Sequence, residues 1–330
     1  MSAAALHGRA VTVSVPATSA NLGAGFDTLG MALELRNLVS VRVTAVTGGH
    51  TTVHVEGEGK GELPAGPANP VAAAVRSGLR IGGCAEADAL SLVIECTNAI
   101  PLARGLGSSA AAQIGGLVAG AALATGSSEI LADGRLAARI LAAADEAEGH
   151  PDNVAAALFG GIVAATRDGD RILTRCIAPV PDATAVVVIP ERRASTADMR
   201  AALPLGVPLA DAAHNVARTA LGVLALERGE VAGFTLLAED RLHQPYRGAK
   251  YPELEHLLGE AMVAGAASAT LSGSGPTLLA MVDVHDDPEA AETLATAMEG
   301  ALDTVGLDAV VDVLPVAHEG AMIESIEAPQ

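Results

Sequence analysis

The most informative stretch of the sequence is P-L-A-R-G-L-G-S-S-A-A, residues 101–111, which leads into a run of small, helix-forming residues up to Leu123. Glycine has no side chain to hold a phosphate away from backbone N–H groups. The first N–H groups of the helix that follows are unpaired and favour an anion. The hydroxyls of Ser108 and Ser109 can add donors or help to position Mg²⁺. The pattern therefore predicts an anion-binding loop.

Two common nucleotide-binding motifs do not fit this loop. No Lys-Ser/Thr pair follows the glycines, so the loop is not a Walker motif. The glycine spacing also fails the dinucleotide fingerprint, and an NAD-dependent dehydrogenase is rejected for that reason. The alternative that needs no ligand is a tight strand-to-helix turn capped by serine.

The composition restricts the partners of the protein. The chain has 330 residues, half of them apolar, which is enough for one large domain or two ordinary ones. The formal net charge of −19 argues against broad binding of nucleic acid or an anionic membrane. No apolar run of membrane-spanning length and no secretory signal is expected. Cys84, Cys96 and Cys176 lack metal-type spacing and are expected to be reduced, buried thiols. A cytoplasmic protein with small-molecule partners is predicted.

Strand-like and helix-like segments alternate along the chain, which predicts an α/β or α+β protein. A boundary near residue 165 is expected, giving domains 1–165 and 166–330, although no linker marks it. The predicted helices include the following segments: 72–79, 110–123, 135–148, 209–228, 231–242, 251–264 and 288–305.

Three motifs, in order, resemble those of the GHMP kinases, a family of small-molecule kinases. V-P-A-T-S-A-N-L-G-A-G-F-D-T-L-G at 15–30 resembles the first, the loop at 101–111 the second, and L-S-G-S-G-P-T at 271–277 the third. E-G-H-P-D-N at 148–153 and H-Q-P-Y-R at 243–247 resemble the branch of the family that phosphorylates L-homoserine.

This resemblance implies an α+β fold. Its N-terminal ATP-binding domain would be similar to domain 2 of ribosomal protein S5, and its C-terminal domain would be ferredoxin-like. The active site would lie between the two, and the last strand can return to the first domain. The left-handed crossover that the family contains would not follow from the usual right-handed rule.

The resemblance also implies a reaction, in which the γ-phosphoryl group of ATP passes to the side-chain hydroxyl of L-homoserine. ATP would be the co-substrate, with Mg²⁺, in threonine biosynthesis, and the protein would be a homodimer. Direct in-line transfer without a dedicated base is expected, because positioning and charge stabilisation dominate in a loose transition state.

The site residues implied by the resemblance fall into three groups. Those expected to bind the substrate are Asn21, Asp27, His150, Thr196, Arg200, Arg247 and Gly273, with catalytic roles for Asn21, Asn153 and Arg200. Those expected to bind the nucleotide are Asn69, Pro101, Leu102, Ala103, Arg104, Gly105, Leu106, Gly107, Ser108, Ser109, Ala110 and Ala111. Ser108 and Glu146 are expected near the metal.

The chain departs from the family pattern at two positions. The family's metal-binding Glu, eight residues before the motif His, is Ala142 here, so either Glu146 reaches in or phosphate, Ser108 and water suffice. Pro70 replaces the usual Leu after Asn69. Whether Asp152 or Asn153 takes the catalytic position stays open at this point.

Two alternative functions stay open at this point. One is a GHMP kinase for another small alcohol, such as mevalonate, a sugar or shikimate. The other is a non-catalytic ligand sensor, which would be expected to have lost the glycines of the loop. Without the motifs, Asp27 would be interpreted as a turn residue and Arg200 and Arg247 as surface charges.

Overall fold

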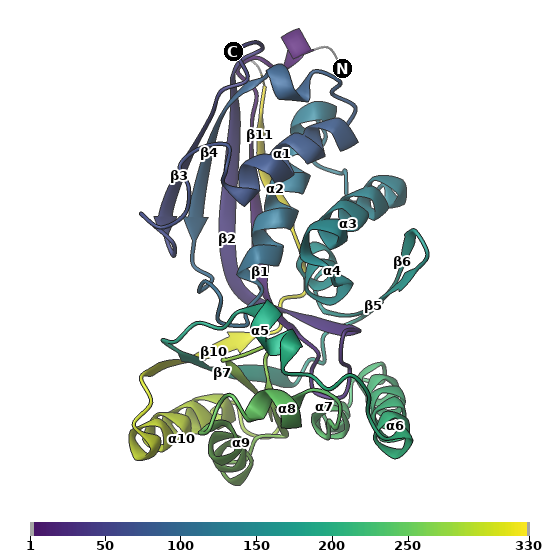
Figure 1. Cartoon of the computed structure of the whole chain (residues 1–330), viewed down its shortest axis with the longest axis vertical. Coiled ribbons are helices and arrows are strands. Elements are labelled where there is room, and N and C mark those ends of the chain that lie inside the picture. The colour runs from purple at the N-terminus through teal and green to yellow at the C-terminus, as the bar shows by residue number, and fades with distance from the viewer. Residues whose placement is uncertain (1–2, 329–330) are drawn as a thin grey trace.

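The structure, a computed structural model, describes residues 3–328 and contains two β-sheets one above the other (Figure 1). The larger sheet has seven strands in the order β11-β1-β2-β4-β3, with β5 paired to β2 and β6 paired to β5. Its strands are β1 (Ala10–Ala20), β2 (Leu29–Ala45), β3 (Thr51–Gly57), β4 (Ser91–Asn98), β5 (Ile162–Asp168), β6 (Arg171–Ile177) and β11 (Met322–Glu327).

The second half of β2 shows why these segments form strands. Val39, Val41 and Val43 are buried, whereas Arg42 and Thr44, which alternate with them, are exposed. Successive side chains of a strand point to opposite faces, so one face of β2 enters the core and the other stays polar.

Four helices cover the buried face of this sheet: α1 (Pro70–Ile81), α2 (Ser108–Thr125), α3 (Gly134–Glu148) and α4 (Pro151–Phe159) (Figure 1). The small residues of α1 and α2 allow close contact between these two helices. A Cβ on Gly120 would lie 2.1 Å from Val75 O, and one on Gly78 would lie 2.1 Å from Leu117 O. Among residues 3–328, α2 is the one helix long and apolar enough to cross a membrane, but 72% of it is buried inside the protein. It is therefore a core helix.

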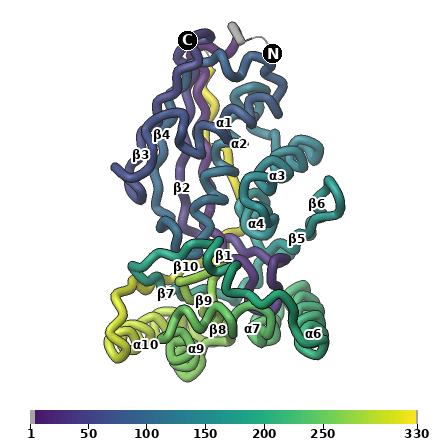
Figure 2. Tube along the Cα trace, in the orientation of Figure 1, coloured from purple at the N-terminus to yellow at the C-terminus, as the bar shows by residue number. Residues whose placement is uncertain are grey.

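The smaller sheet is antiparallel, in the order β10-β7-β9-β8. Its strands are β7 (Ala183–Pro190), β8 (Ser268–Leu271), β9 (Leu278–Asp283) and β10 (Ala309–Pro315). The helices of this unit are α5 (Thr196–Ala201), α6 (Leu209–Leu226), α7 (Ala232–Ala238), α8 (Gln244–Gly248), α9 (Leu254–Val263) and α10 (Ala290–Val305). Short 3₁₀ helices lie at η1 (Ala3–Leu6) and η2 (Ala87–Ala89). Figure 2 follows this path and labels β8 and β9 in the lower unit.

The predicted α+β class is confirmed, and the structure adds several details to the expected arrangement. Residue 165, the expected boundary, lies inside β5, and β6 extends the first sheet to Ile177. β11 returns to pair with β1. We propose that the division between the units falls between β6 and β7. The helix predicted at 231–242 ends at Ala238. Cys84 and Cys96 are buried as predicted, but Cys176 is exposed because it lies on β6, an edge strand that pairs with β5 and with no other strand of residues 3–328.

Candidate active site

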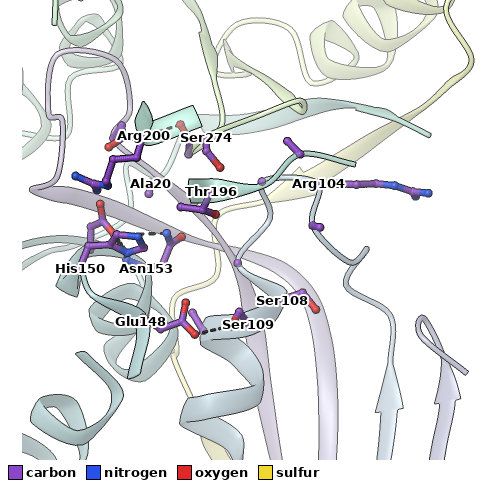
Figure 3. Close-up of a pocket in the computed structure, with 18 of the residues that line it drawn as sticks. Ala20, Arg104, Ser108, Ser109, Glu148, His150, Asn153, Thr196, Arg200 and Ser274 are labelled. Carbon is purple, nitrogen blue, oxygen red and sulfur yellow. Dashed lines mark hydrogen bonds and ion pairs between the residues drawn. The ribbon is translucent and has the colours of Figure 1, made fainter. Parts of the chain in front are cut away.

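A pocket lies where the end of β1, the start of α2, the start of α4, α5, α8 and the β8–β9 turn meet (Figure 3). It brings together residues predicted from distant segments: Asn21, Asp27, Ala103, Arg104, Gly105, Gly107, Ser108, Ser109, Ala110, His150, Asn153, Thr196, Arg200, Arg247 and Gly273. It also includes Asp152, which the sequence left open as the alternative to Asn153, and four residues that were not predicted: Ala20, Glu148, Ala194 and Ser274.

The loop between β4 and α2 needs glycine at two positions. Gly105 has a φ of +87° and Gly107 a φ of +70°, the left-handed region that side chains disfavour. A Cβ on Gly105 would lie 2.6 Å from Ser272 O, and one on Gly107 would lie 1.9 Å from Thr18 Oγ1. Both the backbone conformation and the space therefore exclude other residues.

The carbonyls of this loop are bound to the rest of the protein. The carbonyls of residues 103 to 106 accept hydrogen bonds from Ala194 N (2.9 Å), Thr277 N (3.2 Å), Ser272 Oγ (2.6 Å) and Thr18 N (3.0 Å), respectively. Within residues 3–328, no backbone N–H from 104 to 110 donates a hydrogen bond. The loop is thus fixed through its carbonyls, and its N–H groups are left for an anion at the start of α2.

The loop after β1 is fixed by Asn21, which is buried and has a φ of +74°. Its Nδ2 donates to Gly273 O (2.8 Å), and its Oδ1 accepts from Asp27 N (3.0 Å). Both ends of the amide are therefore used to join the first motif to the β8–β9 turn. Asp27 also has a positive φ of +52°.

Two arginines from the lower unit approach this loop. Arg200, on α5, donates two hydrogen bonds to the Asp27 carboxylate (2.8 and 2.9 Å), and these bonds raise the pKa of Arg200. Arg247, on α8, is 2% exposed and donates from Nη1 to Gly273 O (3.0 Å). Burial, and then the charge of Arg200, lowers the pKa of Arg247. A pocket with two guanidinium groups and an acidic partner suits a zwitterion.

The start of α4 places three polar side chains at the pocket. Asn153 Oδ1 accepts a hydrogen bond from Thr18 Oγ1 (2.7 Å). Asp152 is 2% exposed, and burial raises its pKa to about 6. His150 Nδ1 lies 3.8 Å from Asp152 Oδ1 and is buried without a hydrogen-bond partner among residues 3–328. Figure 3 shows Arg200 pointing toward His150 and Asn153, whereas Arg104 extends away from them.

Six predicted residues do not line the pocket. Asn69 caps α1: its Oδ1 accepts from Val71 N (3.0 Å) and its Nδ2 donates to Pro64 O (2.9 Å). Glu146 is exposed on α3. The others belong to the loop or to α2 but face elsewhere: Pro101, Leu102, Leu106 and Ala111.

Glu148 faces the pocket where Glu146 does not. Ser109 Oγ donates to Glu148 Oε1 (2.5 Å), so the end of α3 meets the start of α2 (Figure 3). Two residues along a helix are about 200° apart around its axis, so Glu146 and Glu148 point in different directions. Gly149, which ends α3 in the left-handed conformation, follows Glu148 directly. A glycine at this point of the sequence could have indicated that the helix ends at Glu148, next to the site. Among residues 3–328, no cluster of three or more His, Cys, Asp or Glu side chains could hold a metal ion.

A backbone anion loop that faces a pocket for a small charged molecule is the arrangement expected of a small-molecule kinase. Two family models match the chain, GHMP kinases N terminal domain over residues 69–161 and GHMP kinases C terminal over residues 225–303. The chain belongs to the GHMP kinase family, whose members use ATP as co-substrate.

Within that family, the chain is similar to homoserine kinases. It is 37% identical to the homoserine kinase of Moorella thermoacetica over 94% of this chain and 99% of that protein. It is 44% identical to that of Clavibacter michiganensis over 85% of each. A crystal structure of homoserine kinase from Cytophaga hutchinsonii matches with a TM-score of 0.82 and 28% identity, covering 95% of this chain and 97% of that one. A mevalonate kinase structure shares the fold, with a TM-score of 0.68, 15% identity and coverage of 94% of this chain and 100% of that one.

Proposed function

We propose that this protein transfers the γ-phosphoryl group of ATP to the side-chain hydroxyl of L-homoserine, which yields O-phospho-L-homoserine for threonine biosynthesis. The observation that carries the proposal is the position of Asp27, Arg200 and Arg247 in one pocket with the free N–H groups of the loop. Similarity to homoserine kinases over most of the chain supports it.

The acceptor carries a carboxylate and an ammonium group, and the pocket offers a partner for each. Arginine pairs with a carboxylate through two parallel N–H donors, and Arg200 already shows this geometry on Asp27 (2.8 and 2.9 Å). A zwitterion between them would satisfy both, with its carboxylate on Arg200 and Arg247 and its ammonium on Asp27. His150 and Thr196 also line the pocket and would hold the rest of the acceptor.

The transfer itself would depend on positioning. The N–H groups of residues 104–110 would hold the phosphates, and Asn21, Asn153 and Arg200 would fix the hydroxyl and the γ-phosphoryl group in line. Thr18 holds Asn153 in the first turn of α4 (2.7 Å), which supports Asn153, an amide and therefore no base, rather than Asp152 as the residue beside the reacting groups. A loose transition state requires little prior deprotonation of the nucleophile.

The residues at the start of α2 fit Mg²⁺. Mg²⁺ is commonly held by one or two carboxylates together with phosphates and water, and Glu148 with Ser108 and Ser109 offers one carboxylate and two hydroxyls. We propose that Glu148, in place of Glu146, holds the ion with Ser108, where it would neutralise charge on the phosphates.

The predicted homodimer has a candidate interface on α6. Four large apolar side chains of this helix are exposed: Leu209 (85%), Val216 (70%), Leu221 (52%) and Leu224 (57%). At about 100° per residue they fall within an arc of about 140° around the helix axis and so form one broad stripe. Two copies of the stripe face to face would bury on the order of 1,000 Å², near the lower limit of a stable interface.

Sedimentation equilibrium of Val216→Asp tests this interface. We expect a dimer in the wild type and a monomer in the variant. Val310→Asp is the control, because Val310 is 60% exposed on β10, and it should leave the dimer intact. A monomeric wild type, or a dimeric Val216→Asp, would contradict the proposal.

An acceptor panel tests the function. ADP release from Mg-ATP would be measured with L-homoserine, D-homoserine, L-threonine, L-serine, mevalonate, shikimate and galactose. We expect kcat/KM for L-homoserine to exceed that of every other acceptor at least about tenfold, a difference of 1.4 kcal/mol. Preference for another alcohol would overturn the substrate, and ATP binding without any turnover would favour a ligand sensor.

A further inference from the structure

Aromatic side chains are scarce in this protein, and one of them lies beside the acceptor pocket. The chain has three Phe, two Tyr and no Trp. Phe26 immediately precedes Asp27 in the loop after β1, and its ring stacks on the His243 imidazole at a centroid distance of 5.1 Å and an interplanar angle of 22°. His243 directly precedes α8, so the stacked pair connects the first motif with the start of that helix.

Both pocket arginines approach the ring of Phe26. Arg247 Cζ lies 5.3 Å from the ring centroid and Arg200 Cζ 5.8 Å. A guanidinium over an aromatic face gains about 0.5–2 kcal/mol. The ring therefore attracts two like charges that otherwise repel one another.

His243 is held in one tautomer by its neighbours. It is fully buried, and its Nε2 lies 2.9 Å from Gly23 O. A carbonyl oxygen only accepts, so Nε2 carries the hydrogen and Nδ1 presents a lone pair. Arg247 Nη1 lies 3.2 Å from this Nδ1 and donates to it. Burial also lowers the pKa of His243 to about 4, which keeps the ring neutral.

The position of His243 is itself fixed. The buried carboxylate of Asp240 accepts from the backbone N–H groups of Leu242, His243 and Gln244, at 2.6 to 2.9 Å. The step of four residues from His243 to Arg247 makes one helical turn, so both side chains lie on the same side of α8. Arg247 is thus held at Nη1 by Gly273 O and His243, while its Nε has no partner among residues 3–328.

We propose that Phe26 and His243 are positioning residues that orient Arg247 toward the acceptor carboxylate. The inference rests on the proposed function, because it takes the carboxylate of L-homoserine as the ligand of Arg247. Neither side chain needs to touch the acceptor. Each acts through the guanidinium: Phe26 from its ring face, and His243 from its lone pair.

Phe26→Leu tests the ring, because leucine keeps apolar bulk and removes the aromatic face. We expect KM for L-homoserine to rise about tenfold while kcat and KM for ATP change less than about threefold. The control is Phe234→Leu, since Phe234 is a buried core residue on α7, and it should leave KM for L-homoserine unchanged. An unchanged KM in Phe26→Leu, or an equal rise in KM for ATP, would overturn the proposal.

Two matched substitutions at His243 test the role of the lone pair on Nδ1. Asparagine can place its oxygen near the position of Nδ1 and so still accept from Arg247, whereas glutamine reaches the position of Nε2 and retains only the bond to Gly23 O. We expect His243→Gln to raise KM for L-homoserine at least about fivefold more than His243→Asn does. Equal effects would contradict an action through Arg247.

A double-mutant cycle separates this inference from a structural effect. In an Arg247→Met background, Phe26→Leu should cause a much smaller further rise in KM for L-homoserine, because Arg247 is gone and only the contact of the ring with Arg200 is left to lose. Additive losses would show that Phe26 acts independently of Arg247. A wild-type protein that does not phosphorylate L-homoserine would instead refute the proposed function, which is a distinct result.

Discussion

At the phosphate end of the pocket the binding groups are backbone N–H groups of residues 104–110, whereas at the acceptor end they are the charged side chains of Asp27, Arg200 and Arg247. The first set is contiguous in sequence and is fixed by its own carbonyls. The second comes from a loop and two helices and is fixed by side-chain contacts. The backbone end thus depends on space and φ angles, and the side-chain end depends on charge. Substitutions at the two ends should therefore change different kinetic constants, those for ATP at the backbone end and those for the acceptor at the side-chain end.

Gly107→Ala addresses the backbone end directly. A left-handed non-glycine residue costs about 1–2 kcal/mol, and a Cβ 1.9 Å from Thr18 Oγ1 must displace the loop. Together with overpacking of about 1–3 kcal/mol, we expect a loss of roughly a thousandfold in kcat/KM for ATP. The measurement is steady-state kinetics with saturating acceptor. Gly134→Ala, where a Cβ has open space, should retain full activity, and a fully active Gly107→Ala would refute the argument.

Arg200→Met addresses the side-chain end. Arg200 would lose its charge-assisted hydrogen bonds to the acceptor carboxylate, and hydrogen bonds to charged groups contribute about 1.5–3 kcal/mol. We expect kcat/KM for L-homoserine to fall roughly 100-fold, with KM for ATP changed less than about threefold. Arg193→Met is the control, because Arg193 pairs with Glu62 on the surface. A parallel rise in KM for ATP would mean that the two ends are not separable.

Glu148→Gln tests a side chain that serves the phosphate end. We expect the Mg²⁺ concentration for half-maximal rate to rise and kcat to fall roughly tenfold, because the ion would lose a charged ligand. Glu146→Gln, an exposed change on the same helix, should behave as wild type in the same Mg²⁺ titration. If Glu146→Gln had the larger effect, the assignment of Glu148 would be wrong.

Asp152→Asn tests how much a buried, charged carboxylate at the acceptor end destabilises the folded protein. The folded-state pKa of about 6 is above the ordinary 3.8, so the native state binds the proton more tightly than the unfolded state does. The contribution of this carboxyl to stability is present below pH 3.8 and is lost as the pH rises through 6. Two pKa units correspond to about 3 kcal/mol, so the variant should be more stable at about pH 7.5 by up to that amount.

Urea unfolding at about pH 7.5 and about pH 3.8 would measure this effect. The stability difference between Asp152→Asn and wild type should shrink at the lower pH. A difference independent of pH would mean that the burial of charge at Asp152 is not its cause.

The two ends also differ in how far the sequence alone could predict them. Gly105 and Gly107 signal a left-handed, close-packed loop without any knowledge of the fold, because the constraint is local. Arg200 and Arg247 carry no such signal, since a lone arginine is usually a surface charge. Only the resemblance to a family placed them with Asp27, which lies in a different unit.

The remaining differences have physical causes of the same kind. Glu146 and Glu148 are both acidic residues near the end of α3, and the rotation of about 200° between them on the helix determines that Glu148 faces Ser109. Asn69 has the pattern of a helix cap, and the structure uses it as one. Residue 165, the expected boundary, lies within β5 because the β5–β6 hairpin continues through it without a linker.

The pairing of β11 with β1 has a consequence for synthesis of the chain. Val13 pairs with Ile323, so the sheet that carries the first motif is completed by a segment that is translated 310 residues later. At about 5–20 residues per second, the edge of β1 would wait roughly 15–60 s on the ribosome for its partner. An open strand edge is prone to pair with other chains. Nascent copies of this protein should therefore depend on chaperones until β11 emerges.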